Sequence, residues 1–186
     1  MGSLFVSTQP IYAQESPAFE KIRDVSPDGK FGLRISCSSE PGDPDNIDSS
    51  LITAVDLVSL PSKKVVVNVG QDCEGNPPHV IRSSDSNWFA YSLADGPRVA
   101  DSCVYHRSGN EFVGLEPENL HVDVKGDVRN VYVNPIRWTK PDVLSLEQFD
   151  ILRGGSGDAT CQFAAKFDEK TGKFQIISKK KVTSKE

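Results

Sequence analysis

The stretch DVSPDGKFGLRISC, Asp24 to Cys37, decides the fold class of this chain. Its first part, Ser26 to Lys30, has proline at the second position and glycine after aspartate, a combination typical of a tight chain reversal. The next part alternates Phe31, Leu33 and Ile35 with smaller or polar residues. Alternation with a period of two is typical of a strand with one buried face. The stretch therefore predicts a β-strand that starts directly after a turn.

The same order of turn and strands recurs along the chain. Two further apolar runs follow the first strand before residue 70, which makes three strands with no long helical crossover between them. Similar units begin near Trp88 and Val143, at nearly equal spacing. Strands joined in this way predict antiparallel meanders. We therefore expect an all-β fold of three meander repeats, propeller-blade-like or sandwich-like, at about 26–70, 84–116 and 139–178.

Little helix is expected elsewhere in the chain. No long apolar stripe has the 3.6-residue period of an amphipathic helix, and Glu15–Ile22 is the one short helix that the sequence allows. Residues 117–135 mix valines with charged residues around Gly126. This pattern predicts one or two further edge strands.

The SPDGK turn at 26–30, followed by an alternating strand and the hairpin VDLVSLPSKKVV, resembles blades of TolB-like and WD40-like β-propellers. The resemblance covers residues 26–69, with weaker echoes in the other two repeats. It implies binding of a protein or ligand at the loops that connect blades, and it carries over no catalytic residue. Because propellers have at least four blades, three repeats imply a self-sufficient domain, a ring completed by a second copy as a homodimer, or a sandwich.

The start of the chain indicates export. Ala13, followed by Gln14 and Glu15, resembles the end of a secretory signal, although a basic n-region is missing and the apolar part is short. We interpret residues 1–14 as the remnant of a signal peptide or a disordered N-terminus, residues 15–178 as a single β domain, and residues 179–186 as a solvated basic tail. A periplasmic or extracellular, secreted protein is predicted. No stretch has the length of a membrane-spanning helix, so an integral membrane protein is not expected.

The four cysteines are widely spaced, and their even number fits either two disulfides or four separate thiols. The signal-like start favours disulfides. Because the first and third strands of a meander run parallel, Cys37 and Cys73 are expected at the same end of one sheet and form the first predicted pair. Cys103 and Cys161 remain as the second. The absence of a CxxC motif makes a zinc ribbon unexpected.

The net charge and the spacing of the acidic, cysteine and histidine residues limit the kinds of ligand and catalytic site that the sequence supports. The net charge of −5 argues against a nucleic-acid partner, since phosphate binding needs a concentrated basic surface. Asp43, Asp45 and Asp48 cluster in one loop, but their spacing departs from that of an EF-hand, so neither a metal nor another cofactor is expected. Cys103 and His106 are three residues apart in a predicted strand, which sends their side chains to opposite faces and argues against a catalytic pair.

The tryptophans are the most informative aromatic residues. Trp88 and Trp138 occupy comparable places in two repeats, where we expect each to fill the interface between neighbouring sheets, with a binding role as the second interpretation. These two residues and the three aspartates of the acidic loop are the candidate binding residues.

The function predicted from these features is an exported, non-enzymatic binding domain that recognises a protein or cell-envelope component through its loops. One alternative is a hydrolase whose site is dispersed over loops, which a pocket joining His79 or His106 to a buried carboxylate would favour. The other alternative is an inhibitor of a secreted enzyme that acts through the loop at 40–50.

Overall fold

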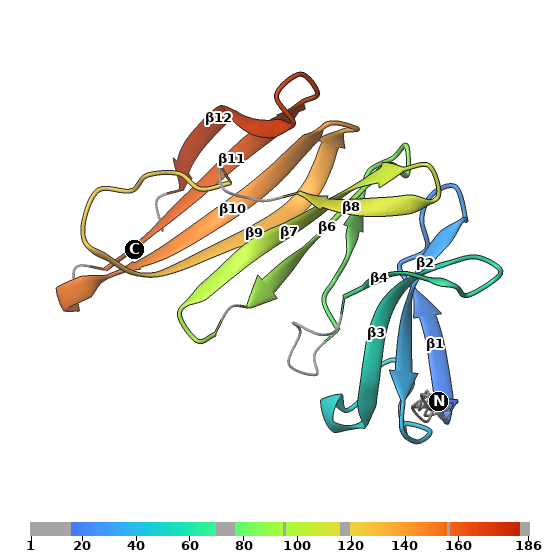
Figure 1. Ribbon diagram of the computed structural model, residues 1–186. Coiled ribbons are helices and arrows are strands. Elements are labelled where there is room, and N and C mark those ends of the chain that lie inside the picture. The colour runs from blue at the N-terminus through green and yellow to red at the C-terminus, as the bar shows by residue number, and fades with distance from the viewer. Residues whose placement is uncertain (1–15, 70–76, 95, 116–119, 156, 183–186) are drawn as a thin grey trace, which may run out of the picture.

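The computed structural model describes residues 16–69, 77–94, 96–115, 120–155 and 157–182. These residues form strands β1 to β12, arranged in two sheets, and two short 3₁₀ turns at Ser49–Leu51 and Arg153–Gly155 (Figure 1). All strand pairs are antiparallel except one. The predicted all-β, antiparallel fold class is therefore confirmed.

The smaller sheet contains the first repeat. Its order is β1 (Phe19–Arg23), β2 (Phe31–Cys37), β3 (Ile52–Ser59) and β4 (Val65–Asn68). The short helix expected near the start of the domain is wrong, because its second half is the edge strand β1 paired with β2. A Cβ at Gly32 would lie 2.7 Å from Ile22 Cγ2, so glycine permits the close packing of these two strands. Pairing with β2 thus overrides the weak local preference for a helix.

The larger sheet unites the second and third repeats. Its order is β12-β11-β10-β9-β7-β6-β5, with β8 also paired to β7. The bounds are β5 (Ile81–Arg82), β6 (Trp88–Ala94), β7 (Val99–Ser108), β8 (Glu111–Leu115), β9 (Val128–Lys140), β10 (Val143–Leu152), β11 (Asp158–Asp168) and β12 (Lys173–Val182).

Strand β9 joins the two repeats into this one sheet. It pairs antiparallel with β10 on one side. On the other side it pairs parallel with β7, where Val131 lies opposite Val99 and Tyr132 lies opposite Ala100. The predicted edge strand in residues 117–135 is therefore wrong, since β9 is central and pairs on both sides. Val133 is buried on one of its faces. Within the part of the chain that the structure describes, the meanders close no ring of separate blades, and the arrangement is sandwich-like.

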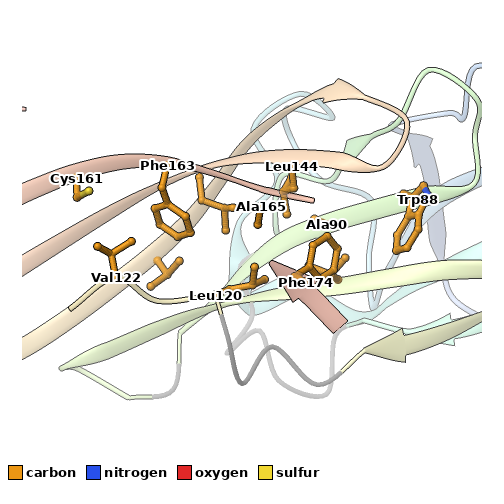
Figure 2. Close-up of a cluster of buried hydrophobic side chains, with 12 residues drawn as sticks. Trp88, Ala90, Leu120, Val122, Leu144, Cys161, Phe163, Ala165 and Phe174 are labelled. Carbon is orange, nitrogen blue, oxygen red and sulfur yellow. The ribbon is translucent and has the colours of Figure 1, made fainter. Parts of the chain in front are cut away.

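The two faces of the larger sheet have separate cores. Phe89 and Tyr91 of β6 face the smaller sheet and pack with Phe31, Leu33 and Leu57. The alternate residues of β6, Trp88 and Ala90, point to the other face, as strand geometry requires, where they join the core drawn in Figure 2. One face therefore makes the sandwich, and the other has a core of its own.

The larger sheet curls around this second core. The ring of Trp88 on β6 lies 4.8 Å from that of Phe167 on β11 and 5.9 Å from that of Phe174 on β12, centroid to centroid. In sheet order, β7, β9 and β10 lie between β6 and β11. Because these three strands separate β6 from β11, the sheet must be strongly curled to bring the rings of Trp88 and Phe167 together.

Residues 120–122 cross the curled face, and Gln148 of β10 holds them there. Its Oε1 accepts the Val122 N–H at 2.7 Å, and its Nε2 donates to the Val122 carbonyl at 2.8 Å. Leu120 and Val122 are buried beneath this contact. The Gln148 Nε2 also donates to the carboxyl of Asp150, whose pKa is raised by burial. A side-chain amide thus replaces the partner strand that this segment lacks.

The predicted Cys103–Cys161 disulfide is wrong, whereas the predicted Cys37–Cys73 disulfide includes a residue outside the described part of the chain and stays a prediction. Cys37 and Cys161 are buried with unbridged thiols, and burial raises the pKa of the Cys37 thiol. Cys103 packs on the face toward the smaller sheet, whereas Cys161 belongs to the curled core. Opposite faces of one sheet cannot be bridged, because the Cβ vectors point apart. Cys73 lies outside the described residues.

The lysines that the sequence assigns to a basic tail lie in the exposed edge strand β12. Lys179, Lys180 and Lys181 belong to this strand and pair with Phe163, Gln162 and Cys161 of β11, respectively. Charged residues on an edge strand discourage pairing with other chains. The described part of the chain includes no helix long and apolar enough to cross a membrane.

Candidate functional site

A hollow of about 560 Å³ opens at one end of the curled sheet, and its lining includes Trp88, His106 and Phe167. The imidazole of His106 packs against the ring of Trp88 at a tilt of 32°, with ring centroids 4.1 Å apart, and it lies 6.0 Å from the ring of Phe167. The three residues come from β6, β7 and β11. We call this feature the Trp88 hollow.

A tight turn positions Trp88. The Oγ of Ser83 accepts the Trp88 N–H at 3.0 Å and donates to the carboxylate of Asp85. That carboxylate also accepts the N–H and side-chain amide of Asn87. Ser86 adopts a φ of 62°, which closes the turn. The tryptophan thus enters β6 from a turn whose polar groups satisfy one another.

Trp138 lies beside Trp88 on the same sheet. Their ring centroids are 5.5 Å apart, and both belong to the curled face. The expectation that each tryptophan fills the interface between neighbouring sheets is therefore wrong, since the merged sheet places both in one core. The indole Nε1 of Trp138 is buried without a hydrogen-bond partner. Trp138 packs against Trp88 but does not itself line the hollow.

The rim of the Trp88 hollow is charged. Its polar residues come mainly from the turns before β6, between β9 and β10, and between β11 and β12: Asp85, Asn87, Asp142, Lys166, Asp168, Glu169, Lys170 and Gln175. The Lys166 ammonium lies 3.5 Å from the Asp142 carboxylate. Asp168 accepts the N–H of Lys170 and the side-chain amide of Gln175, each at 3.0 Å. Carboxylates outnumber ammonium groups on this rim.

The acidic loop is part of the smaller sheet, and its carboxylates support the loop itself. Asp45 accepts from the Lys21 ammonium at 2.6 Å, and Asp48 accepts the Ser50 N–H at 2.9 Å. These hydrogen bonds lower the pKa of both aspartates. Asp43 accepts the N–H of Asp45 at 2.9 Å. The three carboxylates do not converge, and no group of three potential metal ligands occurs among the described residues.

The hollow does not join a histidine to a buried carboxylate. His106 lies against Trp88, and none of the described carboxylates hydrogen-bonds to it. The buried carboxylates have other partners: Asp56 pairs with Arg34 at 2.7 Å, and Asp150 accepts from Gln148. Cys103 and His106 lie on opposite faces of β7, because Cys103 packs toward the smaller sheet. Within the hollow, Asp85 and Asp168 accept structural hydrogen bonds, and Asp142 pairs with Lys166.

Comparison with known proteins finds no family model that matches the chain and no curated protein that resembles it. Sequence reasoning singled out Trp88 and considered His106 separately, but it did not place His106 and Phe167 beside Trp88. His106 is the cross-strand partner of Trp88 in the β6–β7 pair, whereas Phe167 on β11 is brought to both residues by the curl of the sheet.

Proposed function

We propose that this chain is an exported, non-enzymatic binding domain that recognises a protein or cell-envelope component at the Trp88 hollow. The observation that carries the proposal is the combination of an open aromatic hollow with a polar rim supplied by three turns. Recognition sites commonly combine an apolar, aromatic centre with a polar rim. The proposal of export rests on the signal-like sequence in residues 1–14.

The charge of the rim indicates which partner group fits. Asp85, Asp142, Asp168 and Glu169 surround rings whose faces attract cations. A basic side chain of a partner would meet both carboxylates and aromatic rings at this place. Complementary charge of this kind sets the specificity and the rate of association more than the affinity.

Capture from a cell-envelope fraction of the source organism tests the proposal, with purified protein immobilised as wild type or as Glu169→Lys. Glu169 lies on the rim, and its substitution leaves the hydrogen bonds that Asp85 and Asp168 accept in place. We expect the wild type to retain a defined component that Glu169→Lys loses. Glu40→Lys is the matched control, because Glu40 is exposed and far along the chain from the hollow.

Three outcomes separate the alternatives. Retention of the same component by Glu169→Lys would refute the hollow as the binding site. Loss of the component by Glu40→Lys, with retention by Glu169→Lys, would favour the loop at 40–50 as the binding site. It would thereby support the alternative that the chain inhibits a secreted enzyme. Absence of any component retained by the wild type above a blank resin would contradict binding to the envelope.

A further inference from the structure

A second groove, separate from the Trp88 hollow, lies between the two sheets. It has a volume of about 670 Å³ and is flanked by the β3–β4 turn on one side and the β7–β8 turn on the other. Its lining includes Lys30, Phe31, Lys64, Val65, Arg107 and Phe112. We call it the inter-sheet groove.

The apolar part of this groove is preformed. Phe31 of the smaller sheet meets Phe112 of the larger sheet edge to face, with ring centroids 5.0 Å apart. Both rings are nearly buried, whereas Val65 on β4 is 44% exposed. An apolar side chain of a partner would extend the contact between the two phenylalanines toward Val65.

The charged part of the groove is positive. Lys30 and Lys64 form no salt bridge with any described residue. Arg107 is fixed by Asp28 at 2.8 Å and by the Gly109 carbonyl at 2.8 Å, with its guanidinium 4.7 Å from the ring centroid of Phe31. Glu111 is the single carboxylate in the lining. A cationic groove on a chain of net charge −5 is a local feature that favours an acidic partner.

The strands beside the groove favour an extended partner. Strand β4 pairs with β3 alone, and β8 pairs with β7 alone, within the part of the chain that the structure describes. The two strands approach each other across the groove. Each strand therefore has one edge that no other described strand covers, and an extended peptide can add to such an edge as a further strand.

We propose that the inter-sheet groove binds an extended, acidic segment of a partner protein. Apolar side chains of the segment contact Val65 and Phe112, and its carboxylates pair with Lys30 and Lys64. This site shares no residue with the Trp88 hollow, so it stands independently of the function proposed above.

The test uses an N-acetylated hexapeptide of alternating valine and glutamate, and the same peptide with lysine in place of glutamate. Binding to the full chain is followed by amide chemical shifts and by fluorescence anisotropy. We expect the glutamate peptide to shift the amide signals of residues 64–66 and 110–112. The double variant Lys30→Glu, Lys64→Glu should bind it at least about ten-fold more weakly, as expected for reversal of two complementary charges.

The control is Lys125→Glu with Lys173→Glu, which reverses two exposed lysines outside the groove and should leave binding unchanged. Glu169→Lys should also bind the peptide normally, which separates this site from the hollow. The proposal is overturned by any of three results: no binding up to about 1 mM peptide, equal binding of the lysine peptide, or undiminished binding by the Lys30, Lys64 double variant.

Discussion

Ser26 and Ser83 perform the same task in two different turns. Each is buried, each Oγ accepts the N–H of the aromatic residue five positions later at 3.0 Å, and each donates to the aspartate two positions later. The fourth residue of each turn has positive φ, 70° at Gly29 and 62° at Ser86. The repeated sequence order therefore encodes a repeated hydrogen-bond network.

Replacing either serine with alanine removes two hydrogen bonds and leaves a buried N–H without a partner. We expect Ser26→Ala and Ser83→Ala each to lower the free energy of unfolding by about 1–3 kcal/mol, measured by urea denaturation. Ser84→Ala is the control, since Ser84 is exposed in the same turn. A loss as large for Ser84→Ala would show that the network is not the cause.

Asp28 connects the two turns and, with them, the two sheets. Its N–H donates to the Ser86 Oγ at 3.0 Å, and its carboxylate accepts from Arg107 at 2.8 Å. Burial raises the pKa of Asp28, but hydrogen bonds from Ser26, the Lys30 N–H and Arg107 outweigh burial and lower the pKa to about 2. The carboxylate form is therefore the one that the folded state prefers.

A lowered pKa makes Asp28 stabilising above its ordinary value of 3.8, and this contribution is lost as the pH falls from there through about 2. We expect the free energy of unfolding to fall in this window and Asp28→Asn to flatten the fall. Denaturation at a series of pH values measures both. An equally steep loss in Asp28→Asn would assign acid sensitivity to other carboxylates.

Among the elements, the segment at 120–122 depends on one side chain for its place. Gln148→Ala removes both hydrogen bonds to Val122 and leaves buried backbone groups unpaired. We expect a loss of about 2–4 kcal/mol in the free energy of unfolding and faster amide exchange at Val122. Gln162→Ala is the control, because Gln162 is exposed and contacts Glu147. Unchanged exchange at Val122 would refute this role of Gln148.

The strands differ in whether a short stretch of sequence is enough to predict them. Strand β2 is predictable, since the alternation from Phe31 to Ile35 and the turn before it are contained in a short stretch. Strands β1 and β9 are not, because their place depends on distant partners. Residues 128–133 have the mixed polarity of an edge strand, yet β9 becomes central because β7 and β10 pair with it on either side. The sequence draws attention to Trp88, but it does not predict that the ring of Trp88 meets that of Phe167.

For the molecule as a whole, stability comes from its packed cores and not from covalent links between the described cysteines. Alkylation of the unfolded chain without reductant should modify Cys37 and Cys161, as read by peptide mass spectrometry. The same reagent should leave both unmodified in the folded chain, because both are buried. Failure of either cysteine to react after unfolding would reveal a disulfide that the structure does not have.

The two sheets are held together by an aromatic cluster centred on Phe89, so they should unfold as one unit. Phe89 is fully buried, is stacked on Tyr105 at 4.6 Å and meets Phe112 edge to face at 5.0 Å. We expect Phe89→Ala to lower the free energy of unfolding by about 3–5 kcal/mol through the cavity that it leaves. Because β2 and β3 pack on the same cluster, amide exchange should accelerate together in both sheets. Acceleration confined to the larger sheet would instead show that the smaller sheet is stable without it.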